Sequence, residues 1–126
     1  MQKTRIISYF IAVAVIIAGL IYWSYYEANK PSKYDGFAQC IADSGAKFYG
    51  AFWCSHCQSQ KKMFESAAKL LPYIECSTPD GKSILPICAE KKIESFPTWD
   101  FSDGSRQTGE MHLSALAGKT KCVLPQ

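Results

Sequence analysis

Several common functional motifs are absent from this sequence of 126 residues. It contains no G-x-G-x-x-G or P-loop pattern and no serine-triad pattern, so we expect no bound nucleotide, no other cofactor and no hydrolase chemistry. Histidine is scarce, with two residues, and His112 has no cysteine or acid at metal-ligand spacing. We interpret His112 as a surface residue and predict no metal site.

A basic surface is also missing from most of the chain. The net charge is +3, but residues 34–126 hold ten Lys and Arg residues against ten Asp and Glu residues, so the excess lies in the first 33 residues. Nucleic-acid binding requires a clustered basic face. We therefore predict no nucleic-acid partner.

Charge is absent from one long apolar segment at residues 6–23. A helix rises about 1.5 Å per residue, and roughly 17–25 residues cross the hydrocarbon core of about 30 Å. The segment therefore predicts a transmembrane helix within an anchor at residues 1–23.

A cleavable signal peptide is the alternative interpretation of this segment. Its apolar region would be about 7–15 residues long and would be followed by small residues. Here the segment is longer and ends in the aromatic-rich sequence IYWSYY at 21–26, which suits a membrane interface. We favour an uncleaved anchor. Lys3 and Arg5 precede the span, a slight bias that places the N-terminus in the cytoplasm and the following domain outside it.

The remaining chain has room for one small domain, which we assign to residues 34–126. Residues 24–33 form a short polar linker, which reaches at most about 33–36 Å when fully extended. The domain is therefore expected to stay close to the membrane surface.

Cysteine, in contrast, is plentiful, with six residues, as expected in an oxidising compartment. Cys54 and Cys57 form a C-x-x-C motif after a predicted strand at 47–52 and before a helical pattern. Cys54 would lie in the first helical turn, where unpaired N–H groups and the helix dipole favour a thiolate. In such motifs the thiol pKa of about 8.5 falls to roughly 3.5–7.5. A partly cationic His56 would act in the same direction.

We interpret Cys54 as a nucleophile and Cys57 as the resolving thiol of a redox pair. The alternatives are half of a zinc site and an inert disulfide. The other cysteines, at 40, 76, 88 and 122, supply no second C-x-x-C that would complete a tetrahedral site. The redox interpretation is therefore favoured.

The segment 49–57 (YGAFWCSHC), followed by Gln58, by Gln60-Lys61 and by 96–99 (FPTW), resembles the thioredoxin-like superfamily. The sequence YIEC at 73–76 narrows the resemblance. It is similar to the thioredoxin-like domain that bacteria and archaea fuse to, or pair with, a membrane protein resembling vitamin K epoxide reductase. The resemblance extends from about residue 37 to residue 122.

This resemblance implies that Pro97 follows a cis peptide bond and lies against the C-x-x-C motif. A cis X-Pro bond costs only about 0.5–1 kcal/mol over trans, and it would expose the backbone of the preceding residue to a partner strand. Trp53, Phe96, Pro97 and Thr98 are therefore the expected substrate-binding residues. An ordinary trans proline that opens a hairpin strand is the alternative.

Two departures from the family pattern affect the expected chemistry. Many relatives have a buried acid six residues before the first cysteine, but this chain has Phe48 there, and an apolar side chain cannot move a proton. Release through Cys57 would then depend on water or on His56. Ser55 stands where disulfide-forming relatives more often have proline, which leaves the strength of the expected oxidising tendency open.

The four other cysteines are expected to form two structural disulfides. We favour Cys76–Cys88, because domains resembling this one carry a cysteine pair at similar places, and Cys40–Cys122, which would tie the first helix of the domain to the end of the chain. Each would stabilise the domain by about 2–4 kcal/mol. Alternatively, Cys40 or Cys88 is a buried free thiol.

Hydrophobic periodicity agrees with an α/β, thioredoxin-like fold, in which a central mixed sheet is flanked by helices. The pattern predicts helices, strands and a hairpin in the order α-β-α-β-α-β-β-α. The predicted segments are a helix from 37 to about 44, a strand at 47–52, a helix from Cys57 to 71, a strand at 73–76, a helix from Ser83 to about 92, a hairpin at 98–109 and a helix at 113–119.

The sequence thus predicts a membrane-anchored, extracytoplasmic thiol–disulfide oxidoreductase. Its expected partners are exported cysteine-containing proteins and, by resemblance alone, a quinone-linked membrane oxidase similar to vitamin K epoxide reductase. The alternatives are a dedicated reductant on the same fold, and a non-catalytic module that binds a metal or a client protein.

Overall fold

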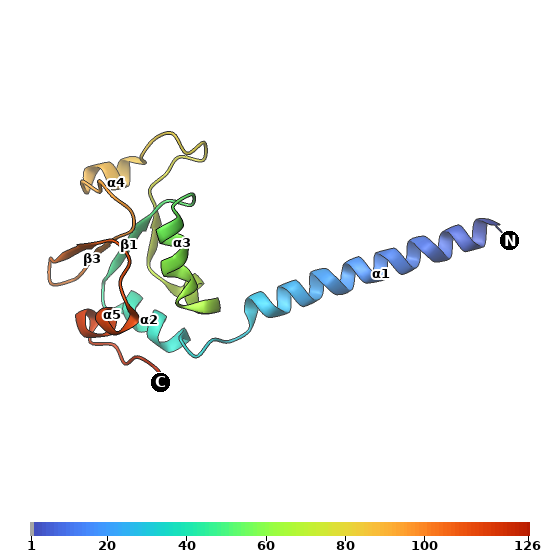
Figure 1. The fold of residues 1–126 in the computed structure, drawn as a ribbon, viewed down its shortest axis with the longest axis horizontal. Helices are drawn as coiled ribbons and strands as arrows, with labels where there is room; N and C mark the ends of the chain where they lie inside the picture. Colours follow the sequence, from blue (N-terminus) through green and yellow to red (C-terminus); the bar gives the residue numbers. More distant parts are fainter. Residues whose placement is uncertain (1) are drawn as a thin grey trace. The chain divides into compact units, whose positions relative to one another are not determined.

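The computed structural model describes residues 2–126, and Met1, the first residue of the predicted anchor, lies outside them. The chain divides into a helical N-terminal unit that ends at Lys30 and a domain that begins at Pro31. Figure 1 shows the long helix α1 of the first unit and the small α/β domain of the second.

The N-terminal unit is a single helix, α1 (Gln2–Asn29). Within residues 3–29 an 18-residue window has a mean hydropathy of 2.4, so the helix is long and apolar enough to cross a membrane, a test that a signal sequence also passes. The helix continues six residues past Trp23, so residues 24–29, which the sequence assigned to the linker, are helical. A helix advances only about 1.5 Å per residue, against roughly 3.3–3.6 Å in an extended chain. Residues 24–29 therefore cover less distance than they would as part of an extended linker.

A four-stranded mixed sheet organises the domain, in the order β2-β1-β3-β4. β1 runs parallel to β2 and antiparallel to β3, and β3 and β4 form an antiparallel hairpin. The elements are α2 (Asp35–Asp43), β1 (Lys47–Gly50), α3 (Ser55–Lys62), the 3₁₀ helix η1 (Glu65–Leu70), β2 (Tyr73–Glu75), α4 (Pro86–Glu90), β3 (Thr98–Asp100), β4 (Arg106–Thr108) and α5 (Leu113–Thr120).

The two faces of β1 belong to two hydrophobic clusters, because successive strand residues point to opposite sides of a sheet. Phe48 is fully buried in the larger cluster, where its ring stacks on Trp99 with 4.5 Å between centroids. Tyr49 lies in the smaller cluster with the Cys76–Cys88 pair. Helices cover the sheet around these clusters, and the fold is thioredoxin-like, as the sequence predicted.

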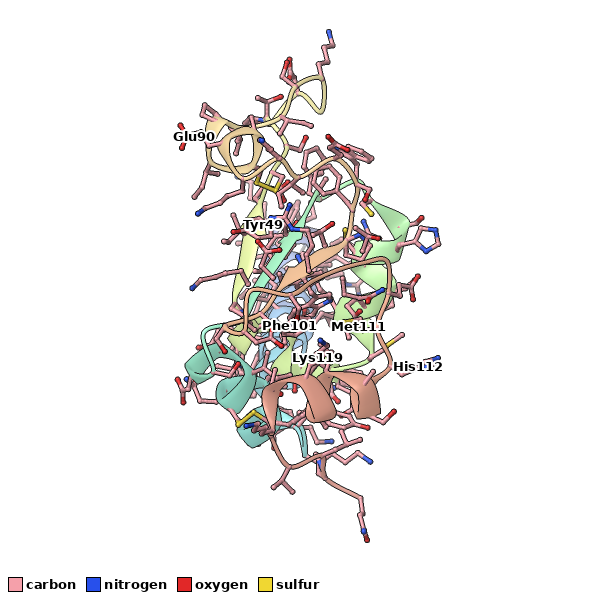
Figure 2. All side chains as sticks on the ribbon, turned by 90° about the vertical axis from the view of Figure 1, so that its left-hand side faces the viewer. Tyr49, Glu90, Phe101, Met111, His112 and Lys119 are labelled. Atoms are coloured by element: carbon pink, nitrogen blue, oxygen red, sulfur yellow. A yellow bond between two sulfur atoms is a disulfide. The ribbon has the colours of Figure 1, made fainter. Side chains whose placement is uncertain are left out.

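Two disulfides fix the ends of this domain. Cys40–Cys122 joins α2 to the segment after α5, and Cys76–Cys88 joins the end of β2 to α4. Figure 2 shows them as yellow bonds at opposite ends of the domain, one beside α4 and the other beside α2 and α5.

Two helices differ from the sequence expectation. The apolar stripe that predicted one helix to residue 71 is divided, because α3 ends at Lys62 and Glu65, with φ of +55°, starts a separate 3₁₀ helix. The helix expected to begin at Ser83 starts at Pro86 instead, and Ser83 does not cap it. The segment before it is held by an antiparallel bridge between Ser77 and Ile84, which competes with helical hydrogen bonding.

Candidate active site

The C-x-x-C motif lies where β1 passes through a turn into α3. Cys54 is the N-cap of α3, with extended backbone angles, and Cys57 lies in the first helical turn. The backbone N–H of Cys57 donates to Cys54 Sγ at 3.3 Å, so the sulfur accepts from an amide that the helix leaves unpaired. Both cysteines carry free thiols.

The two thiols differ in their surroundings. Both cysteines belong to the larger hydrophobic cluster, but Cys54 also lines a surface groove and is 7% exposed, whereas Cys57 is 1% exposed. Burial, reinforced by the hydrogen bond with Cys54, raises the pKa of Cys57 to about 12. Cys54 is therefore the thiol that a partner meets first, and Cys57 is a protonated thiol behind it.

The loop before β3 closes over Cys54. The Cys54 thiol donates to the Phe96 carbonyl oxygen at 3.7 Å, and the Phe96–Pro97 peptide bond is cis. The Thr98 side chain points into the domain: it is 2% exposed and its hydroxyl donates to the Ser95 carbonyl at 2.7 Å. Of the predicted substrate-binding residues, Trp53 and Phe96 line the groove, and Pro97 and Thr98 are buried beside it.

The groove has a volume of about 580 Å³ and lies between the C-x-x-C motif and the loop that leads from β2 to α4. Trp53 forms one wall and is 54% exposed, and its ring meets that of Phe96 edge to face at 6.1 Å. Trp53 Nε1 donates to Ser77 Oγ at 2.8 Å, and Gly81 lies against the same ring. The sequence did not predict that Ser77, Gly81 and Ile84 line this groove.

His56 faces an acid that sequence reasoning missed. Its Nδ1 lies 2.5 Å from Oε1 of Glu110, a residue 54 positions later in the chain, and the imidazole remains largely exposed. Fully buried Gln60 brings this segment to α3, because its Oε1 accepts from the Met111 N–H at 2.7 Å and its Nε2 donates to the Met111 carbonyl at 3.0 Å. No local pattern in the sequence links these positions.

A second group of polar side chains lies behind Cys57. Lys61 Nζ is 3.2 Å from the centre of the Tyr73 ring, and the Tyr73 hydroxyl donates to Glu75 Oε2 at 2.8 Å. Chiefly through burial, the pKa of Lys61 is lowered and that of Tyr73 is raised. Phe48 occupies the position of the missing acid, with its ring 5.2 Å from that of Tyr73.

Among residues 2–126, no three or more His, Cys, Asp or Glu side chains gather in a way that could hold a metal ion. His112 is exposed immediately before α5, and Figure 2 shows its ring projecting away from the domain.

Comparison with known proteins shows similarity to a protein of named activity. No protein-family model matches the chain. The chain is similar to the thiol-disulfide oxidoreductase LTO1 of Arabidopsis thaliana, with 49% identity over 94 residues. The similar region covers 71% of this chain but 24% of the relative, so this chain spans about a quarter of the length of that protein.

Proposed function

We propose that this chain is a membrane-anchored thiol–disulfide oxidoreductase that promotes disulfide formation in exported proteins. The observation that carries the proposal is the pair of free thiols at the start of α3, with Cys54 in the groove and Cys57 buried behind it. The name of the Arabidopsis relative, a thiol-disulfide oxidoreductase at 49% identity, supports the same chemistry.

The proposed reaction begins with the pair oxidised to a disulfide. A client thiolate attacks Cys54 Sγ, the Cys54–Cys57 bond breaks, and Cys57 leaves with the electron pair and takes up a proton. A second client thiolate then attacks the client sulfur of the mixed disulfide and releases Cys54 as a thiolate. The client gains one disulfide and the Cys54–Cys57 pair is reduced by two electrons.

The groove supplies a binding site for the client beside the reacting sulfur. Trp53 and Phe96 offer apolar contacts in the groove, and Ile84, 47% exposed, adds another from the loop between β2 and α4. Such a surface suits an extended, partly apolar client segment with a cysteine at its centre. His56, in our proposal, favours the thiolate form of Cys54 and so the reduced state of the pair.

The membrane location and the oxidising partner are further parts of the proposal. The length and composition of α1 support an anchor, and the two disulfides outside the active site support an oxidising compartment. Re-oxidation by a quinone-linked membrane protein similar to vitamin K epoxide reductase is supported by sequence resemblance alone.

Cysteine variants of the full chain test the proposed activity. With a reduced, cysteine-containing model protein as client, Cys54→Ser should abolish disulfide transfer, because the atom that the client attacks is gone. Cys57→Ser should accumulate a mixed disulfide with the client when the reaction is run in the reducing direction. A Cys54→Ser variant that turns over normally would refute the proposal and favour a non-catalytic binding module.

The reduction potential of the Cys54/Cys57 pair decides the direction of the reaction. Equilibration of the full chain with glutathione buffers should give a value between about −120 and −180 mV, well above the roughly −270 mV of thioredoxin. A value near or below that of thioredoxin would identify a reductant on the same fold.

A further inference from the structure

Proton transfer at Cys57 needs a route, because the buried acid that related domains use is replaced by Phe48. The Phe48 ring stacks on Trp99 and contacts Tyr73 edge to face, so the space where an acid would lie is apolar core. Cys57 nevertheless must lose or gain one proton in each reaction cycle, and burial raises its pKa to about 12. Without a proton acceptor, thiolate formation at neutral pH would be rare.

The structure places polar groups on the other side of the same sulfur. β1 and β2 are parallel, with Phe48 opposite Tyr73 and Gly50 opposite Glu75, so both β2 side chains lie on the face of the sheet that Phe48 occupies. From α3, Cys57 and Lys61 project toward this face one helical turn apart. The titratable groups that interact with Cys57 are Cys54 at the N-cap of α3, Lys61 on α3 and Tyr73 on β2, and Glu75 in turn interacts with Lys61 and Tyr73.

Gly50 lets the Cys57 sulfur and the Tyr73 side chain approach the same point of β1. A methyl group built on Gly50 would lie 2.7 Å from Tyr73 Cε2, 2.9 Å from Cys57 Sγ and 3.3 Å from Tyr73 Oη, so the sulfur and the hydroxyl end of the tyrosine ring both pack against the bare backbone of Gly50. Tyr73 Oη donates to Glu75 Oε2 at 2.8 Å, and Glu75 is half-buried and in contact with water. A hydroxyl that is hydrogen-bonded to a partly exposed carboxylate therefore lies beside the same glycine as the sulfur.

We propose that the Tyr73 hydroxyl and the Glu75 carboxylate form a proton relay for the resolving thiol Cys57, an inference that rests on the proposed function. When Cys57 attacks a mixed disulfide, its proton passes to Tyr73 Oη while the hydroxyl proton of Tyr73 moves to Glu75, which releases it to water. The Cys57 thiolate forms the bond to Cys54 Sγ, and the partner sulfur leaves with the electron pair. In the opposite direction the relay returns a proton to the departing Cys57 thiolate.

Lys61 has a separate, electrostatic role in this arrangement. Its ammonium group lies over the Tyr73 ring, on the same helix face as Cys57, and its charge favours the thiolate. Glu75 is also a structural residue, because its Oε1 accepts from the backbone N–H groups of Phe52 at 3.2 Å and Ser77 at 2.9 Å. A test must therefore separate proton transfer from support of the loop.

An aromatic disulfide, 5,5′-dithiobis(2-nitrobenzoate), separates the two steps in a single trace. The Cys54 thiolate attacks it and releases the first coloured thiolate, and Cys57 then loses its proton, forms the Cys54–Cys57 disulfide and releases the second. The full chain is used in detergent after mild reduction that leaves the two structural disulfides closed. In Cys57→Ser the second phase should disappear, which assigns it to the resolving step.

Glu75→Gln and Tyr73→Phe should slow only the second phase at pH 7, by about tenfold or more, as expected for loss of general acid–base assistance. Between pH 6 and 9 the second phase of these variants should rise about tenfold per pH unit, because it then depends on free thiolate, whereas the natural chain should show a shallower dependence. A high concentration of a small carboxylate buffer should restore part of the rate in Glu75→Gln.

Tyr49→Phe and Glu90→Gln are the matched controls. Tyr49 lies in the cluster on the opposite face of the sheet and Glu90 projects from α4, as Figure 2 shows, so neither change should affect either phase.

Equal second phases and pH slopes in Tyr73→Phe and the natural chain, with the first phase intact, would overturn the relay. If Glu75→Gln fails to fold, the test of the relay relies on Tyr73→Phe, which removes only one oxygen atom. A first phase that persists in Cys54→Ser would instead refute the proposed function.

Discussion

At the scale of single residues, the two cysteines of one short motif acquire different chemistry from their positions. Cys54 accepts a hydrogen bond from the start of α3 and borders the groove, whereas Cys57 is enclosed by the hydrophobic cluster. A charge is costly in that environment, so the folded protein holds Cys57 as a neutral thiol. This preference links the redox chemistry to the stability of the reduced domain.

The raised pKa of Cys57 predicts a pH-dependent loss of stability in the reduced protein. The thiol titrates near its ordinary value of 9.0 when unfolded but near 12 when folded, so as pH rises the unfolded chain loses this proton first. The contribution is fully present below pH 9 and declines above it by about 1.4 kcal/mol per pH unit.

Cys54→Ser, which cannot form the active-site disulfide, gives the cleanest measurement of this effect. Its free energy of unfolding in urea should fall between pH 8 and 10.5 relative to the double variant Cys54→Ser/Cys57→Ser, which lacks the titrating thiol. Burial, the largest cause of the raised Cys57 pKa, is retained in Cys54→Ser, where the thiol stays in the hydrophobic cluster. Parallel curves for the two proteins over this range would contradict the prediction.

At the scale of elements, the sequence predicted the order of helices and strands, but not where two of the helices begin or end. The spacing of Cys54 and Cys57 before an amphipathic pattern is a local signal, and it correctly predicted a strand–turn–helix unit. The single helix to residue 71 was wrong because its apolar stripe is also compatible with a helix interrupted at Glu65, which the sequence pattern cannot distinguish.

The same limit applies to the candidate site. Cys54, His56 and Cys57 are neighbours in the sequence, so one motif reveals them. Glu110 reaches His56 only because Gln60 docks the segment at Met111, which no sequence spacing encodes. Tyr73 and Glu75 lie behind Cys57 because of the register between β1 and β2. That register becomes visible only in the folded sheet.

The two structural disulfides should contribute unequally to the stability of these elements. In the chain-entropy description, stabilisation increases with the length of the closed loop, and the sequence separations are 82 for Cys40–Cys122 and 12 for Cys76–Cys88. Replacing both cysteines by alanine should therefore cost about 4–5 kcal/mol for the first pair and about 3 kcal/mol for the second.

Chemical denaturation of the two double variants, with the natural chain alongside, measures this difference. The Cys76→Ala/Cys88→Ala variant should in addition weaken client binding, because the loop that carries Ser77 and Gly81 against Trp53 loses its link to α4. The Cys40→Ala/Cys122→Ala variant, far from the groove, serves as the control for this second effect. A larger binding defect in that control would show that the loop does not depend on its disulfide.

At the scale of the whole molecule, the proposed function joins two physically different units. The domain has an equal number of acidic and basic residues from position 34 onward, and its apolar side chains form a buried core. No residue in the apolar window of α1 is buried, and its large side chains remain about half or more exposed. Transfer of that surface from water to lipid is strongly favourable, which makes a bilayer the natural environment for α1.

An uncleaved anchor makes a definite prediction for the full chain expressed in bacterial cells. The protein should remain in the membrane fraction after an alkaline wash with its full mass of 14.1 kDa, because residues 3–29 form a helix long enough to span the bilayer. Protease added to the outside of spheroplasts should digest the domain, since Lys3 and Arg5 favour a cytoplasmic N-terminus.

Val15→Lys tests whether α1 is what holds the protein in the membrane. A charge near the centre of a spanning helix costs about 2.5–3.5 kcal/mol on insertion scales, so this variant should move toward the soluble fraction, whereas Tyr26→Lys, near the end of α1, should stay in the membrane. Recovery of a shortened, soluble protein that begins after residue 23 would instead identify the segment as a cleaved signal peptide. The domain would then act as a diffusing oxidoreductase, and its encounter with a membrane oxidase would depend on concentration rather than on a tether.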